Sequence, residues 1–510
     1  RGWKFRMAVD YVMYGIIAAI VGGITLVGCA VFVIQMQHPE DRNAAWLPKL
    51  IVLLGLFLAC STILLLPFDA SMAQSCEDDP ECPALVGLGI AWYICFISIA
   101  IMTFVVIPLA FFWYETDDED GCGSRICTTI CWSSVNLFVF ICILLGLYFT
   151  VGYVELPVEV VVPYAITNGS YFVRPTTPNP EFFAVAAMPS YSATQQIQTS
   201  LVIYILALLS FIGWILTTLF GGMGLVALPM DLIGAWFNRP RPIDLKQFAE
   251  KKLQLKRRCE ELIQVGKETK DKFKRNKNAF KERRFTNKYK KMVMDLEDEL
   301  QVLNLCYKRN EINPLVPWGQ LFIGIWAAII SFSWMLQLIL EVFLKGLSGP
   351  YLSDVFLKLT AAFPLFGIVA YGVFAFYMLC AIVKGSIKFA GRFFLISVHP
   401  MKINGTMMNS FLFNVGLILI CSVSCTQLCT TAFAQYAHSS AISQIFVSQI
   451  QYLKGLSFFY SVDVPVFYSL LFIVAMLQFV WSMIILCFCQ KQQATTVADA
   501  MAELRREQRS

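Results

Sequence analysis

Residues 199–229 read TSLVIYILALLSFIGWILTTLFGGMGLVALP and contain no charged side chain. About 20 apolar residues in a helix cross the ~30 Å hydrocarbon core of a bilayer, and a backbone in lipid must satisfy its own hydrogen bonds. This stretch is therefore expected to be a transmembrane helix. Similar stretches predict spans near residues 9–35, 48–68, 84–113, 130–152, 199–229, 316–343, 355–382, 408–436 and 465–489. The predicted fold class is all-α, a polytopic membrane protein with about nine transmembrane helices.

The composition agrees with a membrane protein, since 57% of the 510 residues are hydrophobic and only 15% are charged. Soluble domains carry about 25% charged residues. Most of the 17 cysteines lie inside apolar stretches, where a thiol behaves as a small hydrophobic group. Cys76 and Cys82 lie between two predicted spans and are the expected disulfide pair.

The distribution of positive charge predicts the orientation. Residues 238–312 hold 22 of the 40 Lys and Arg against 12 Asp and Glu, and positive loops stay in the cytosol. An odd number of spans then places the N-terminus outside and the C-terminus inside. The expected regions are five spans in 1–236, a basic cytosolic arm in 237–314, four spans in 315–490 and a cytosolic tail in 491–510. Residues 153–200 fall outside and carry a predicted glycosylation site at Asn168.

The arm is expected to form two antiparallel helices joined near residues 275–284, because its leucines recur at loose helical spacing among charges. One interpretation is a solvated hairpin beneath the spans. The other adds contact with anionic headgroups or a partner through a basic cluster: Lys272, Lys274, Arg275, Lys277, Lys281, Arg283 and Arg284.

Residue patterns typical of enzymes are scarce in this sequence. The three histidines have no metal-ligand spacing, and there is no phosphate loop, nucleophile elbow or dinucleotide fingerprint. We therefore expect no enzyme, no cofactor or bound metal and no nucleic-acid partner. Cys421, Cys425 and Cys429 share one helix face; helix packing is favoured there over a soft metal.

Two features inside the spans have both a structural and a functional interpretation. Glu341 and Lys358 lie at facing ends of neighbouring spans, where an ion pair either pins two helices or forms a polar gate. Pro364 lies inside the seventh predicted span and is expected to kink it. Kinks often border solute paths, yet many are purely structural.

Several motifs along the chain resemble the lipocalin-interacting membrane receptor (LIMR) family. The most specific are His399-Pro400-Met401-Lys402 and the block 406–419, TMMNSFLFNVGLIL, which includes Asn409 and Asn414. Supporting motifs are Gln37-His38-Pro39, Ala45-Trp46-Leu47-Pro48-Lys49, Leu66-Pro67-Phe68-Asp69, Val106-Ile107-Pro108 with Phe112-Trp113-Tyr114-Glu115, and Phe220-Gly221-Gly222-Met223-Gly224-Leu225 with Leu228-Pro229 and Arg239-Pro240. The resemblance covers nearly the whole chain and implies nine helices with a basic inner loop.

The resemblance implies a non-enzymatic membrane protein. The closest branch holds plant LIMR proteins and a lysosomal escort of an ABC transporter in cobalamin export, which implies an endolysosomal membrane and cobalamin as a transported ligand. A second branch implies an endocytic plasma-membrane receptor for lipocalin-type carrier proteins. A third hypothesis, from the residues, is a solute or lipid transporter with a cavity near Pro364 and the polar face of the eighth span, Asn409, Asn414 and Gln427.

Overall fold

The computed structural model describes most of the chain. The described residues are 2–38, 41, 46–75, 83–116, 122–161, 190–237, 243–275, most positions in 289–307, then 315–343, 351–389, 391–393, 396–398, 401, 405–446, 450–454, 456, 459 and 466–488. They divide into two compact units: unit 1 comprises Arg1–Leu225 with Ile330–Met476, and unit 2 comprises Val226–Ile329 with Leu477–Ser510.

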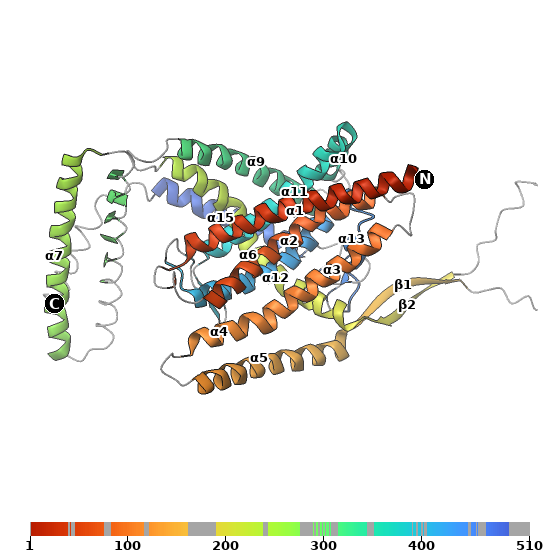
Figure 1. The fold of residues 1–510 in the computed structure, drawn as a ribbon, viewed down its shortest axis with the longest axis horizontal. Coiled ribbons are helices and arrows are strands. Elements are labelled where there is room, and N and C mark those ends of the chain that lie inside the picture. Colours follow the sequence, from red (N-terminus) through yellow and green to blue (C-terminus); the bar gives the residue numbers. More distant parts are fainter. Residues whose placement is uncertain are drawn as a thin grey trace, which may run out of the picture. The chain divides into compact units, whose positions relative to one another are not determined.

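Long helices dominate the described residues (Figure 1). Nine segments among them are long and apolar enough to cross a membrane, which confirms the all-α polytopic fold. The helices that contain these segments are α1 (Gly2–Met36), α2 (Trp46–Ser75), α3 (Pro83–Ile101) continued by η2 (Met102–Val106) and α4 (Ile107–Glu115), α5 (Cys122–Val151), α6 (Leu201–Phe237), α9 (Leu315–Phe343), α11 (Pro364–Lys388), α12 (Met408–Ala432) and α15 (Val466–Phe488).

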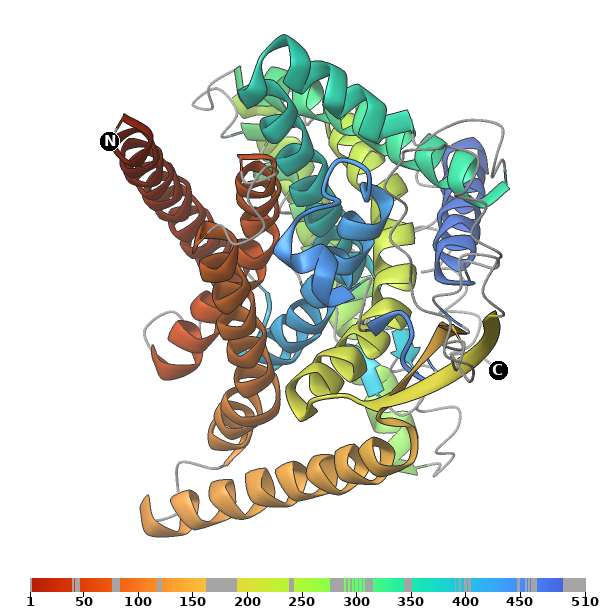
Figure 2. The same cartoon turned by 90° about the vertical axis from the view of Figure 1, so that its right-hand side faces the viewer.

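Helix α12 forms the core of unit 1. Its most apolar window is 83% buried, against 11% for the windows of α1 and α5, so α12 is shielded from lipid by its neighbours. It packs on α2, α11 and α4. Helix α5 contacts α4 and lies at the edge of this unit in both ribbon views (Figures 1 and 2).

The third span contains one π-helical turn, η2. The amide of Ile107 donates to the carbonyl of Met102, five residues back, and Pro108 follows at the start of α4. A proline nitrogen cannot donate to the preceding turn, and single π-turns are a common way for a helix to accommodate such an interruption.

The seventh span differs from its predicted bounds. A kink at Pro364 was expected within residues 355–382, whereas the structure has two separate helices, α10 (Tyr351–Ala362) and α11 (Pro364–Lys388). Phe363 between them is extended, with φ −158° and ψ 120°. Proline disfavours the helical conformation of the residue before it, so the chain breaks there and the span begins at Pro364.

Strands occur in two small antiparallel pairs among the described residues. In the first, β1 (Tyr153–Val161) pairs with β2 (Ser190–Gln198), with Tyr153 opposite Gln198. In the second, β3 (Gly391–Phe393) pairs with β4 (Ile396–Val398). The first pair lies in the segment expected outside the membrane, where no strand was predicted.

Candidate functional site

The N-terminus of α12 is fixed by the loop that follows α1. The buried carboxylate of Asp41 accepts one hydrogen bond from the Tyr114 hydroxyl, at 2.8 Å, and one from the Met408 amide, at 3.0 Å. Met408 is the first residue of α12, so Asp41 satisfies one of the free amides of its first turn and places a negative charge where the helix dipole favours it.

Further contacts bring three of the quoted motifs together at this end of α12. The His38 amide donates to the Thr406 carbonyl at 2.9 Å, and the Thr406 amide donates to the Met36 carbonyl at 3.1 Å. The Asn409 side-chain amide donates to the Glu115 carboxylate. Motifs about 290 to 370 residues apart in sequence therefore form one junction, and their role in this structure is to join helix ends.

We expect Asp41→Ala to lower the free energy of unfolding by about 1–3 kcal/mol, because it leaves the Met408 amide and the Tyr114 hydroxyl without their acceptor. Thermal unfolding of the purified protein measures this. Asp354→Ala is the matched control, since Asp354 is exposed on α10. Equal unfolding temperatures for the two variants would contradict the role assigned to Asp41.

A buried polar network joins α6 to α12. The side-chain oxygen of Gln427 accepts from the Ser210 hydroxyl and from the Trp214 indole nitrogen, the latter at 2.8 Å. The hydroxyls of Thr217 and Ser424 lie 2.7 Å apart. These polar groups have hydrogen-bond partners inside the protein, as buried polar groups require. The network therefore holds α6 and α12 together.

Asp69 organises a second buried site, near the end of α2. Its carboxyl group accepts from the Trp92 indole at 2.8 Å and from the amides of Ala441 and Ile442, at 3.1 and 2.9 Å. The side chain has no exposed surface. The two amides begin the short helix α13 (Ala441–Ile445), so Asp69 ties the segment after α12 to α2 and α3.

The arm of unit 2 consists of α7 (Leu245–Arg275) and a facing segment whose described residues between 289 and 307 are helical. Phe248 stacks on Tyr307 with ring centroids 4.5 Å apart, and Arg258 contacts Glu299 at 3.3 Å. Leu262 and Met292 form a buried pair. Since the partner numbers fall as those on α7 rise, the two segments run antiparallel, as the sequence predicted.

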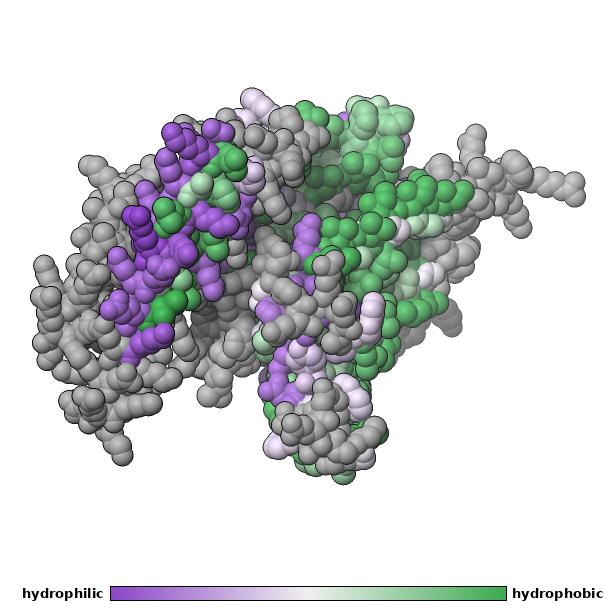
Figure 3. Space-filling model, turned by 60° about the vertical axis from the view of Figure 1, so that its left-hand side comes forward, coloured by the Kyte–Doolittle hydropathy of each residue, from purple (hydrophilic) through white to green (hydrophobic). Residues whose placement is uncertain are grey.

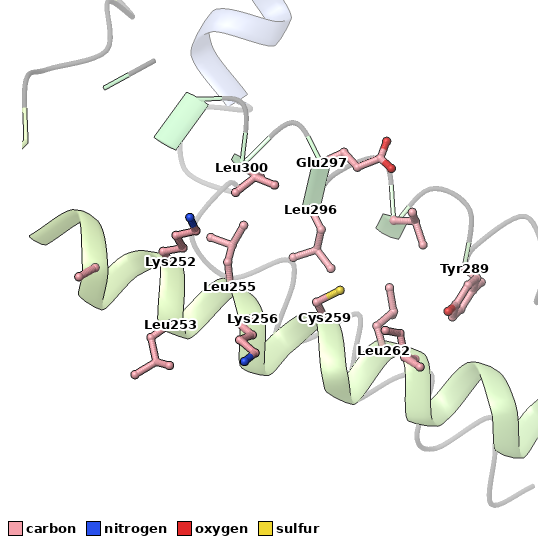
Figure 4. A pocket seen from close by; sticks show the side chains of 13 residues that line it. Lys252, Leu253, Leu255, Lys256, Cys259, Leu262, Tyr289, Leu296, Glu297 and Leu300 are labelled. Carbon is pink, nitrogen blue, oxygen red and sulfur yellow. The ribbon is translucent and has the colours of Figure 1, made fainter. Parts of the chain in front are cut away.

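A groove of about 770 Å³ lies between the two arm segments. Figure 4 shows Leu255 and Cys259 of α7 pointing toward Leu296 and Leu300. Lys252 and Lys256 also line the groove. The face of the arm seen in Figure 3 is mainly hydrophilic, with apolar side chains between the charges, so the groove is an apolar recess in a basic helical arm.

Many of the predicted site residues lie outside the described residues. They are Cys76, Cys82, Asn168, His399, Pro400, Lys402, Lys277, Lys281, Arg283 and Arg284. The backbones of Lys272, Lys274, Arg275 and Glu341 are helical, but their side chains are outside the description. The disulfide, the glycosylation site, the basic contact and the ion pair therefore stay predictions.

The other predicted residues have defined environments. Lys358 is exposed on α10 and Met401 is buried. Asn414 is buried in α12, where its amide donates to the Ser410 carbonyl at 2.8 Å. The thiols of Cys421, Cys425 and Cys429 are buried along α12, as packing positions would be. The Asp41 and Asp69 sites were missed, although Asp69 is the last residue of the quoted motif Leu66-Pro67-Phe68-Asp69.

Comparison with known proteins identifies the family. The sequence model of the LMBR1-like membrane protein family matches residues 14–313. A LIMR family protein of Dictyostelium discoideum is 32% identical over 496 residues, covering 91% of this chain and 96% of the relative. The chain belongs to the LIMR family. A LIMR family protein of Oryza sativa is also 32% identical, and one of Arabidopsis thaliana is 30% identical; each covers 88% of this chain and 92% of the relative.

The matches to these LIMR family relatives cover nearly the whole of both chains, which confirms that the resemblance extends over nearly the whole sequence. Their names state the family and no ligand. No solved structure matches this LIMR family chain. The family is thus established together with an integral membrane location.

Proposed function

We propose that this LIMR family protein is a non-enzymatic escort of endolysosomal membranes that binds a transporter through its basic arm, with cobalamin export as the transport process. The partner would be an ABC transporter, and cobalamin would be its cargo. The buried polar groups around α12 support a scaffold, because the Gln427 and Ser424 side chains bond to α6 and fix the helices in place.

The observation that carries the escort hypothesis is the groove in the arm. Its leucines would accept the apolar face of an amphipathic helix, a common mode of protein recognition. Lys252 and Lys256 beside the leucines would favour acidic residues flanking that face, since opposite charges steer association. The expected partner element is therefore an amphipathic helix with an acidic border.

The experiment compares two exposed leucines of α7. Leu253 lines the groove and is 52% exposed, whereas Leu245 does not line it and is 62% exposed. We expect Leu253→Glu to reduce co-purification of the ABC transporter from lysosomal membranes at least tenfold, a loss of about 1.4 kcal/mol, and to raise lysosomal cobalamin.

Leu245→Glu is the matched control for that substitution and should leave both quantities unchanged. Because both leucines are exposed, neither change removes a buried contact from the arm. Wild-type recovery and cobalamin content in the Leu253→Glu variant would reject the arm as the escort surface.

A lipid or solute transporter is the second candidate, and one observation favours it. A cavity of about 820 Å³ lies beside Pro364, between α2 and α11, where a solute path was predicted. Proteoliposomes that contain the purified chain alone separate the candidates. Movement of radiolabelled cobalamin or of a fluorescent lipid would support transport, and no movement by folded, inserted protein would support the escort.

A further inference from the structure

The cavity beside Pro364 belongs to unit 1 and is formed by four helices. Its lining includes residues of α1, α2, α9 and α11. The break at Phe363 separates α10 from α11 at one end of the cavity. Gly372 has no side chain and lets α11 approach Pro67 of α2, since a Cβ there would meet the proline ring at 3.3 Å. The break and the glycine together leave a recess, which a continuous helix with a larger side chain at this position would fill.

The lining is almost entirely apolar. Apart from Ser71, Tyr377 and Cys380, the side chains that face the cavity are aliphatic, aromatic or proline. The Tyr377 hydroxyl bonds to the Ser331 hydroxyl, which also donates to the Leu225 carbonyl at 2.6 Å. The Tyr377 hydroxyl is thus engaged with the protein, and the cavity favours a hydrocarbon ligand over a sugar, nucleotide or ion.

Most of the cavity lining lies in one half of the membrane. Ile17 and Val21 lie near the start of the membrane-spanning part of α1, residues 15–36, and most lining residues of α11 lie in its first half, with Tyr377 and Cys380 just past the middle. The antiparallel α2 contributes residues near its end, Leu64 to Ser71. Consecutive spans alternate in direction, so these positions share one leaflet, the lumenal one in the predicted topology. The surrounding solvent at this depth is lipid hydrocarbon.

The rim of the cavity is open to that hydrocarbon. Phe363, Leu365 and Val369 line the cavity and are each 50–52% exposed. The lining on α11 runs from Pro364 to Cys380, about 24 Å of helix, and also includes residues of α1 and α2. A flexible chain can follow such a long lining, formed by several helices, better than a rigid ring system can.

We propose that this cavity binds an acyl chain of a glycerophospholipid from that leaflet. The headgroup would then lie at the level of α10, where Asp354 and Lys358 are exposed. The site is independent of the escort hypothesis, because it uses no residue of the arm. Its volume of about 820 Å³ is within the range of ligand-binding pockets, about 300–1,000 Å³.

The test uses the protein in phosphatidylcholine vesicles that contain phosphatidylcholines with a diazirine at different positions along one acyl chain. After illumination, mass spectrometry locates the labelled residues. We expect labelling concentrated on residues 365–377 of α11 and 64–71 of α2, in excess of that on other exposed span residues. Val369→Trp, which places a large ring in the lining, should reduce this labelling at least fivefold.

Val139→Trp on α5 is the matched control, because Val139 is 50% exposed and Val369 is 52% exposed, but only Val369 lines the cavity. Val373→Phe is a second filling variant, used if Val369→Trp does not elute as a folded protein. Labelling spread evenly over all lipid-facing helices would overturn the proposal. Displacement of the label by cholesterol but not by excess phosphatidylcholine would identify a sterol site and overturn the acyl-chain assignment.

Discussion

Gly224→Ala is expected to destabilise the protein by about 2 kcal/mol or more, although it adds one methyl group. A Cβ at Gly224 would lie 1.7 Å from the carbonyl oxygen of Ala381 on α11, so the backbones of α6 and α11 must separate to admit it. Separation also disturbs the second close contact, where a Cβ at Gly385 would lie 1.8 Å from the Phe220 carbonyl. Insertion of atoms into a tightly packed core commonly costs about 1–3 kcal/mol, and backbone cannot yield as a side chain can.

The same glycine motif supplies the control for this substitution. A Cβ at Gly221 would meet only side chains, the nearest at 3.5 Å, which is ordinary van der Waals contact. The free energy of unfolding of Gly221→Ala should therefore lie within about 0.5 kcal/mol of the wild-type value. Thermal unfolding in one detergent, followed by the loss of monodisperse protein on size exclusion, measures both variants. Equal unfolding temperatures for the two would show that α6 and α11 are not packed this closely.

Hydropathy predicted the spans well, because a lipid-exposed backbone has few alternatives to the helix. The close packing of Gly224 has a local sequence signal, because small residues surround it. The break at Phe363 was predicted only as a kink, since proline alone does not reveal whether the helix resumes in line. The Pro364 cavity was anticipated by position, but its apolar lining depends on α1, α2 and α9.

The two carboxylate sites were beyond sequence reasoning for a physical reason. Asp69 was noted as a motif residue at the end of a span, but its partners lie 23 residues away at Trp92 and about 372 residues away at Ala441. The hairpin of β1 and β2 had a local signal that was not used, the valines recurring between Tyr153 and Val161, which favour strands. Contacts between residues far apart in the chain require the fold itself.

Asp69→Ala is the second substitution with a large expected effect, and it should lower the free energy of unfolding by about 3 kcal/mol or more. The substitution leaves the Trp92 indole and the amides of Ala441 and Ile442 without their acceptor, and each unsatisfied buried donor costs about 1–3 kcal/mol. Asp69→Asn keeps one acceptor oxygen but replaces the other with an NH2 group, which donates and cannot accept from these groups. The stability of this variant should therefore lie between that of Asp69→Ala and that of the wild type. The exposed Asp354→Ala on α10 serves as the control.

The stability order wild type, Asp69→Asn, Asp69→Ala is measured by thermal unfolding, and limited proteolysis reports on the segment after α12. That segment is held to α2 by the Asp69 carboxyl group and contains the buried side chains of Ile442 and Phe446. Release of the segment should expose its backbone to protease below the temperature of global unfolding. If Asp69→Ala is cleaved no faster than Asp354→Ala and the two variants unfold at the same temperature, Asp69 does not anchor this segment.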